Sequence, residues 1–259
     1  MPRLSKLSRS IKGKTAIVTG AASGMGRATA ILFADEGANV AVTDLDQGKV
    51  QIVVDEINTA GGNAHGWMLD VTNATHRNSV MSSIVERWGG LDILVNNAGI
   101  AIETTIDATD FEAAWDKTVA VLLTAQAQMI RSCLPQLEKS ESARIINIAS
   151  TEGLGATKGI SPYTAAKTGV IGLTRSLAVE LGPKGITVNC ICPGPILTGM
   201  TAAIPDKAKT EFARRRVAIK RYGDPEEVAH GTLNFALPAS SYMTGAVLPV
   251  DGGMTIKNA

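Results

Sequence analysis

Three side chains in the middle of the chain have the types and spacing needed to move a proton at an alcohol or a carbonyl. Tyr163 and Lys167 are four residues apart, a spacing that places both on one face of a helix. Ser150 stands thirteen residues before the tyrosine, at the end of an apolar run. A free tyrosine ionises near pH 10, about three units too high for a base at neutral pH, and a nearby positive charge lowers that pKa. We therefore expect Tyr163 to be the general acid and base, Lys167 its activator, and Ser150 the residue that orients the substrate oxygen.

A glycine-rich turn near the amino terminus, T-G-A-A-S-G-M-G over residues 19–26, is the second candidate site. It follows an apolar run and opens a helical pattern, so its backbone N–H groups and the helix N-terminus are suited to a pyrophosphate. Asp44 ends the next apolar run, where a carboxylate accepts a hydrogen bond from a ribose 2′-hydroxyl and repels a 2′-phosphate. No Arg or Lys occurs within residues 21–25 or in the two positions after Asp44. The turn thus predicts NAD in preference to NADP, with a helix N-cap or a turn residue as the alternative role for Asp44. The residues expected to bind the cofactor here are Gly20, Ser23, Gly24, Met25, Gly26, Asp44 and Leu45.

The elements that must position these residues follow a repeating pattern of short β-branched runs and longer helical segments. The runs cover residues 15–18, 39–43, 64–69, 92–95, 144–148, 186–191 and 246–250, and the helical segments include 27–36, 47–60 and 75–88. Several runs are apolar almost throughout, which is typical of parallel strands covered on both faces. This order predicts an α/β fold, a Rossmann-type doubly wound parallel sheet of about seven strands with helices on both faces. Ligands of such sheets bind beyond the carboxyl ends of the strands, where both candidate sites fall.

The composition and net charge limit the classes of protein and of binding partner that fit this chain. The chain has 259 residues and a formal net charge of +1, which argues against nucleic acid or an anionic membrane as a partner. No apolar run approaches the length of a membrane-spanning helix, and the three histidines are too scattered to suggest a metal site. The three cysteines, Cys133, Cys190 and Cys192, cannot all pair, and the latter two lie in one apolar run and are interpreted as buried thiols of a cytoplasmic protein. We expect a single domain over 1–259, with a short basic arm over 1–13 and a mobile substrate loop over 194–222. The arm is expected to be solvated, and a targeting role is its alternative.

Further motifs occur in a fixed order along the chain. The pair Asp70-Val71 follows the third run, N-N-A-G occupies 96–99, Pro193-Gly194 follows the sixth run, and V-D-G-G occupies 250–253. With the glycine spacing, Ser150 and the Y-x-x-x-K pattern, these motifs resemble the short-chain dehydrogenase/reductase family over nearly the whole chain. The resemblance implies NAD-dependent interconversion of a secondary alcohol and a ketone, in a homotetramer or homodimer. It also adds residues to the expected cofactor site, namely Asp70, Val71, Asn97, Ala98, Gly99, Tyr163, Lys167, Pro193, Gly194, Ile196 and Thr198.

The chain departs from the family pattern at Leu122, where most members carry an asparagine that is thought to hold a water of a proton relay. No asparagine occurs between Asn97 and Asn147. Two hypotheses follow: either another polar group such as Thr118 or Gln126, one helical turn to each side, replaces it, or turnover is slow. An NAD-binding regulator or scaffold with little turnover is therefore the alternative function, and a methyltransferase is a weaker one.

The substrate pocket is expected to be mainly apolar, with one acidic residue. Its expected members are Ile102, Glu152, Leu154 and Met200. Glu152 stands two residues after Ser150, where small or apolar residues are usual in the family. It is expected either to face the substrate and select a polar or cationic group, or to point to solvent.

Overall fold

Seven strands form one parallel sheet in a computed structural model that describes residues 4–258. The strand order is β3-β2-β1-β4-β5-β6-β7. The chain adds β2 and β3 on one side of β1, then crosses back and adds β4 to β7 on its other side. The strands are β1 (Thr15–Thr19), β2 (Asn39–Asp44), β3 (Asn63–Met68), β4 (Ile93–Asn96), β5 (Arg144–Ile148), β6 (Thr187–Pro193) and β7 (Val247–Val250). The predicted Rossmann-type sheet of seven strands is confirmed, and each strand lies within two residues of its predicted bounds.

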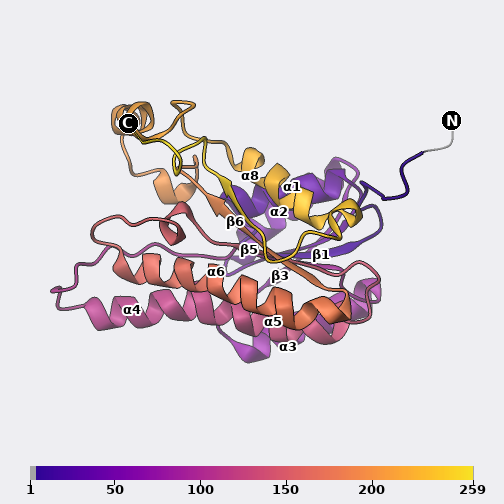
Figure 1. The fold of residues 1–259 in the computed structure, drawn as a ribbon. Coiled ribbons are helices and arrows are strands. Elements are labelled where there is room, and N and C mark those ends of the chain that lie inside the picture. The colour runs from indigo at the N-terminus through magenta and orange to yellow at the C-terminus, as the bar shows by residue number, and fades with distance from the viewer. Residues whose placement is uncertain (1–3, 259) are drawn as a thin grey trace.

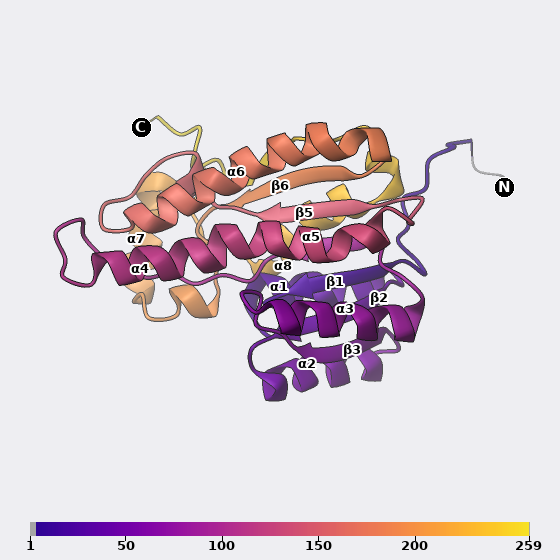
Figure 2. The same cartoon turned by 90° about the horizontal axis from the view of Figure 1, so that it is seen from below.

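Helices cover both faces of the sheet (Figures 1 and 2). One face carries α1 (Gly24–Asp35), α2 (Gln47–Thr59) and α8 (Pro225–Ala236), and α1 packs on α8. The other carries α3 (Ala74–Trp88), α4 (Phe111–Val119), α5 (Ala125–Leu137) and α6 (Ser161–Leu181). A π-helical turn, Ala120–Thr124, joins α4 to α5 in one continuous helix. The remaining helix, α7 (Asp206–Arg216), lies between β6 and α8 in the chain.

The sheet separates two apolar cores because successive side chains of a strand point to opposite faces. In β1, Val18 packs in the core beneath α1 and α2 with Phe33, whereas Ile17 packs in the core beneath α3 and α5 with Met129. The strands are apolar on both faces because each face is covered by a layer of helices. Among the described residues, no helix is long and apolar enough to cross a membrane.

The amino-terminal arm is partly anchored. Residues 4–10 are exposed, as expected, but Ile11 is fully buried in the core beneath α1, and the Ser8 carbonyl accepts a hydrogen bond from the Ala239 N–H at 2.8 Å. The described part of the predicted arm is thus exposed except at Ile11, where it is anchored to the fold. Arg3, which belongs to the predicted basic arm, lies outside the described residues.

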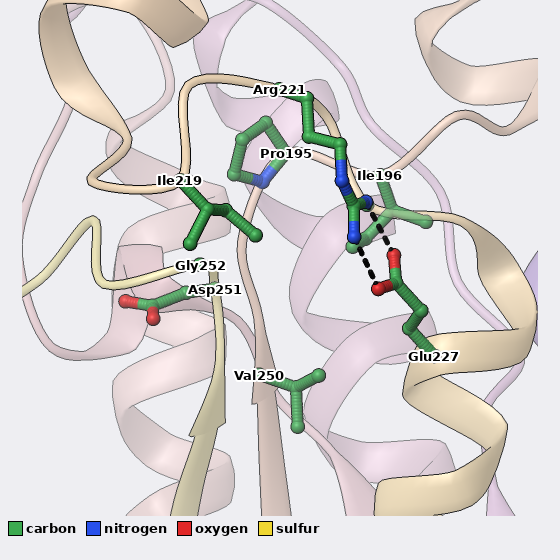
Figure 3. A pocket seen from close by; sticks show the side chains of 9 residues that line it. Pro195, Ile196, Ile219, Arg221, Glu227, Val250, Asp251 and Gly252 are labelled. Atoms are coloured by element: carbon green, nitrogen blue, oxygen red, sulfur yellow. Dashed lines mark hydrogen bonds and ion pairs between the residues drawn. The ribbon is translucent and has the colours of Figure 1, made fainter.

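The segment predicted as a substrate loop is closed at its base. Gly223 N–H donates to the Pro195 carbonyl and Leu197 N–H donates to the Gly223 carbonyl, both at 2.9 Å. Figure 3 shows Arg221 and Glu227 paired beside Pro195 and Ile196, around a small cavity of about 60 Å³. The Arg221 guanidinium donates two hydrogen bonds to the Glu227 carboxylate, at 2.6 and 2.7 Å. Residues 197–222 therefore leave and rejoin the fold at one point, which lies between β6 and α8.

Candidate active site

Ser150, Tyr163 and Lys167 meet where β5 ends against the first two turns of α6. Ser150 is nearly buried, and its Oγ accepts a hydrogen bond from the Glu152 N–H at 3.1 Å. The Ser150 hydroxyl also acts on the Tyr163 side chain and lowers its pKa. Lys167 is 4% exposed, and its Nζ lies 5.6 Å from the centroid of the tyrosine ring. The structure thus brings together the three residues that sequence reasoning selected for proton transfer.

Burial in the protein disfavours the charged forms of both Tyr163 and Lys167. Burial raises the pKa of Tyr163, the Ser150 hydroxyl opposes that rise, and the nearby Glu152 carboxylate adds to it. Burial lowers the pKa of Lys167 to about 8, against the opposing effect of Cys190 and Cys192. The expectation that the Lys167 ammonium and an oxidised nicotinamide together lower the tyrosine pKa concerns the protein with its cofactor bound, and it stays a prediction. The lysine ammonium is directed to a backbone acceptor, because Nζ donates to the Ile148 carbonyl at 2.8 Å.

The glycine-rich turn connects β1 to α1 and has a different use for each glycine. A Cβ on Gly20 would lie 2.7 Å from Ala98 Cα, and one on Gly26 would overlap the Gly20 carbonyl, so both positions are required for close backbone packing. Gly24 instead has φ +54°, and a Cβ there would lie 3.2 Å from the Thr198 side chain across a cleft. Ser23, the N-cap of α1, makes no side-chain capping bond, and the first turn has no acidic residue. The helix N-terminus therefore keeps backbone donors and positive potential for an anion.

The cleft beside this turn has a volume of about 420 Å³. It is lined from α1 by Gly24 and Arg27, from the opposite side by residues 197–199, 201 and 202, and from α7 by Lys209. Arg27 is paired with Glu56 at 2.6 Å, and Lys209 with Asp206 at 3.4 Å. A glycine that leaves room, free backbone donors and two cationic side chains fit the pyrophosphate of a dinucleotide.

Asp44, at the end of β2, lies against the glycine-rich turn. Its Oδ2 accepts from the Ala22 N–H at 3.1 Å and its Oδ1 from the Leu45 N–H at 2.7 Å. Asp46, not Asp44, caps α2 by accepting from the Lys49 N–H at 3.1 Å, whereas the two backbone bonds of Asp44 fit the other part of its alternative role, that of a turn residue. Leu45 is exposed beside the carboxylate. The pair therefore stands at the edge of the glycine-rich turn, as expected for a ribose contact.

Several predicted cofactor residues hold the walls of the cleft in place. The Asn97 Nδ2 donates to the carbonyls of Thr19 and Gly20, at 2.9 and 3.1 Å, so this side chain ties β4 to the glycine-rich turn. Asp70 accepts from the N–H and the hydroxyl of Thr72 and thereby closes its own turn after β3.

The backbone near β6 is fixed in the same way. A Cβ on Gly194 would lie 2.7 Å from Asp251 Cα, so the V-D-G-G motif packs directly on the turn that follows β6. Ile196 is buried at the closed base of the loop, and Thr198 begins the short 3₁₀ helix Gly199–Thr201. Most of the remaining residues expected at the cofactor site lie at strand ends, with Val71 after β3, Ala98 and Gly99 after β4, and Pro193 at the end of β6. Met25 lies in the first turn of α1.

Glu152 turns into the protein. Its Oε1 accepts from the Thr157 hydroxyl at 2.9 Å, and its Oε2 is buried without a hydrogen-bond partner among the described residues. Its negative charge acts on Tyr163. The alternative in which Glu152 points to solvent is therefore wrong. Of the other expected pocket residues, Ile102 is half-buried, and Leu154 and Met200 are exposed.

Two groups next to Lys167 were missed or left undecided by sequence reasoning. The Ile148 carbonyl, which holds the ammonium, is a backbone atom and has no signature in the sequence. Gln126 was only one of two candidates to replace the absent asparagine, and its Nε2 donates to that same carbonyl at 3.5 Å. Leu122 is fully buried in the π-helical turn, with its Cδ2 close to Gly99.

Comparison with known proteins covers almost the full chain. A family profile described as enoyl-(acyl carrier protein) reductase matches residues 20–255. The chain is 38% identical over 246 residues to a 3-oxoacyl-[acyl-carrier-protein] reductase of Thermotoga maritima, covering 95% of this chain and 99% of the relative. It is 39% identical over 247 residues to a 2,5-dichloro-2,5-cyclohexadiene-1,4-diol dehydrogenase of Sphingobium indicum, covering 95% and 98%.

Solved structures of similar chains superpose over the whole fold. A dehydrogenase/reductase from Sinorhizobium meliloti has 41% sequence identity and a TM-score of 0.90, covering 97% of this chain and 98% of that chain. Levodione reductase has 31% identity and a TM-score of 0.89, covering 95% and 98%.

Proposed function

The chain belongs to the short-chain dehydrogenase/reductase family of oxidoreductases, and from that membership we propose that it transfers hydride between NAD(H) and a secondary alcohol or ketone. The observation that carries this proposal is the meeting of Ser150, Tyr163 and Lys167 at the end of β5. The nicotinamide, when bound, supplies or accepts the hydride.

The residues of this chain would divide the remaining work among them. Tyr163 takes the hydroxyl proton of an alcohol at its Oη, or returns it to a ketone oxygen in the reverse direction. Ser150 donates a hydrogen bond to the same substrate oxygen and holds it beside the tyrosine. The Lys167 ammonium stabilises the phenolate, which burial alone disfavours.

The cofactor contacts in this proposal follow the cleft. The N-terminus of α1, with Gly24 and Ser23, holds the pyrophosphate, and Asp44 accepts from the adenosine ribose. Asn97 acts through the turn that it fixes. By resemblance to the family, Ile196 and Thr198 meet the carboxamide of the nicotinamide. NAD is proposed over NADP because a 2′-phosphate would meet the Asp44 carboxylate.

Three further parts of the proposal concern the whole protein. Residues 194–222 act as a substrate loop that moves about its closed base. The three buried free thiols suit a reducing compartment, and we place the protein in the cytoplasm. Association into a homotetramer or homodimer would cover exposed apolar side chains such as Trp115 on α4 and Val179 on α6. Light scattering on the purified protein tests that last point.

The test of the proposed function is a substrate panel followed at the nicotinamide absorbance. The panel contains cyclohexane-1,4-dione, acetoacetyl-CoA and gluconate, each offered with the matching redox forms of NAD and NADP. We expect turnover with NAD(H) and a loss of about 10²–10⁴-fold in Tyr163→Phe, which removes the proton-transferring group and keeps the ring. Tyr242→Phe, on an exposed tyrosine outside this site and outside the substrate loop, is the matched control. NADP preference would contradict the role of Asp44. Tight NAD binding without turnover would favour a regulator or scaffold, which Leu122 alone supports.

A further inference from the structure

Gln126 is a buried polar residue that the proposed reaction does not yet use. It lies at the start of α5 and is 3% exposed. Its Nε2 donates a long hydrogen bond, 3.5 Å, to the Ile148 carbonyl. Lys167 Nζ donates to the same oxygen at 2.8 Å. One backbone carbonyl at the end of β5 therefore joins this amide to the catalytic lysine.

The other end of this amide has no partner. Gln126 Oε1 is buried and makes no hydrogen bond with any residue from 4 to 258. A buried acceptor left in this way costs about 1–3 kcal/mol, and such groups are usually satisfied by an ordered water. An ammonium has three donors, and the Ile148 carbonyl takes one of those of Lys167. An amide with a free acceptor and a cation with donors to spare thus share one carbonyl oxygen.

The helix that carries Gln126 has an irregular turn just before this residue. The π-helical turn Ala120–Thr124 directly precedes α5, and such turns often occur at functional sites. Thr118, Leu122 and Gln126 follow one another at intervals of four residues and are all buried. The Leu122 side chain is apolar and packs beside Gly99, so it cannot bind a water. A neighbouring polar side chain would have to bind it instead. The Thr118 hydroxyl is also buried without a partner, but only Gln126 reaches the carbonyl that holds the lysine.

We propose that Gln126 is the positioning residue of Lys167: its amide N–H fixes the Ile148 carbonyl, and its Oε1 holds an ordered water that accepts a second hydrogen bond from the lysine ammonium. This inference rests on the proposed function, because it concerns the same lysine. The second acceptor keeps the ammonium charged and aligned in a buried setting that otherwise disfavours it. The amide one turn after Leu122 thereby performs the work that the side chain of Leu122 cannot.

The test replaces the amide with an apolar group of similar length. Gln126→Leu is compared with Gln128→Leu, a half-buried glutamine two residues further along α5. With NADH and cyclohexane-1,4-dione, or the panel ketone reduced fastest, we expect Gln126→Leu to lose about tenfold in kcat while KM for NADH stays within about twofold. Its pH profile shifts because the lysine loses its charge at a lower pH. Gln128→Leu keeps the parent values.

Rescue separates positioning from packing. Leu122→Asn, introduced into the Gln126→Leu background, returns an amide to the same helix face one turn earlier, and we expect it to recover most of the lost kcat and the parent pH profile. Unchanged kcat and pH profile in Gln126→Leu would overturn the proposal. A loss of activity accompanied by a lowered Tm, an unshifted pH profile and no rescue would also overturn it, since a packing role predicts that outcome.

A readout without turnover keeps this test independent of the proposed reaction. In a crystal structure of the parent at high resolution, we expect a water bonded to both Gln126 Oε1 and Lys167 Nζ, and we expect it to be lost in Gln126→Leu. An ordered Gln126 Oε1 without such a water would overturn the proposal. If the parent turns over no substrate of the panel, the proposed function fails while this structural outcome still decides the role of Gln126.

Discussion

At the scale of single residues, the candidate site places two ionisable groups where burial opposes their charged forms. Lys167 is held by the Ile148 carbonyl, and the Ser150 hydroxyl and the Glu152 carboxylate act in opposite directions on the pKa of Tyr163. Glu152 raises the pKa of the tyrosine because a phenolate next to a carboxylate is repelled. The working protonation state of Tyr163 therefore depends on small changes in its neighbours.

The charge of Glu152 sets the first prediction. Glu152→Gln removes the negative charge and keeps the shape, so the pKa of Tyr163 falls, and the phenolate needed for alcohol oxidation forms at lower pH. We expect the pH profile of kcat for oxidation to move toward acid. Glu141→Gln, on an exposed loop after α5, should leave the profile in place. An alkaline shift, or none, in Glu152→Gln would show that the carboxylate does not act on the tyrosine.

At the scale of elements, the strand-to-helix turn after β1 assigns separate tasks to its glycines. Gly20 and Gly26 admit neighbouring backbone and side chains, whereas Gly24 keeps the cleft open opposite Thr198. Gly24 and Gly89, the C-cap of α3, both have left-handed φ angles, of 54° and 81°, but only Gly24 faces the cleft. Substitutions at both positions introduce the same backbone strain, but only a substitution at Gly24 also places a side chain in the cleft.

The second prediction compares Gly24→Ala with Gly89→Ala. An L-residue in the left-handed region costs about 1–2 kcal/mol, so both variants should lose a similar amount of stability in denaturant unfolding. Only Gly24→Ala places a methyl group in the cleft, and we expect its NAD affinity to fall by about tenfold or more, which is about 1.4 kcal/mol. Calorimetric titration with NAD measures this. Equal NAD affinities in the two variants would mean that the cofactor does not approach Gly24.

At the scale of the whole molecule, a chain of buried polar groups crosses the interior beneath the candidate site. Asn96 Nδ2 on β4 donates to Asn147 Oδ1 on β5 at 2.9 Å, and Asn147 Nδ2 donates to the Thr174 hydroxyl on α6 at 3.0 Å. Thr174 in turn donates to the Val170 carbonyl at 2.8 Å. All three side chains are buried, so this chain ties the two central strands to the helix that carries Tyr163 and Lys167.

The third prediction tests that connection. Asn147→Ala leaves the Asn96 amide without its acceptor and the Thr174 hydroxyl without its donor, each at a cost of about 1–3 kcal/mol. We expect the free energy of unfolding to fall by at least about 2 kcal/mol, measured by denaturant titration. Asn63→Ala, which removes a hydrogen bond to Asn39 at the exposed start of β3, should cost much less. Similar losses in the two variants would remove the special role of the buried chain.

The sequence alone was sufficient for the number of strands and, to within two residues, for their bounds along the chain. Near-continuous apolar runs such as Arg144–Ile148 and Thr187–Pro193 identify covered parallel strands because both faces must be apolar. The sequence also selected Ser150, Tyr163 and Lys167, since residue type and helical spacing are local properties. It could not show that Ile11 is buried, that Glu152 turns inward, or that Asn97 holds the glycine-rich turn. Asn97 and Ile11 depend on partners far along the chain, and Glu152 depends on how its own loop folds back to Thr157.

The sequence by itself therefore determined the class of fold, the family and the groups available for chemistry, because periodicity and motif spacing are written within short stretches of chain. Only the tertiary structure decided how those groups are held. The Ile148 carbonyl joins Gln126 and Lys167 from three separate elements, and no local pattern predicts which backbone oxygen two distant side chains will share. Distances and burial in the folded state fix the electrostatic setting of the lysine and the tyrosine, and with it the chemistry that we propose for them.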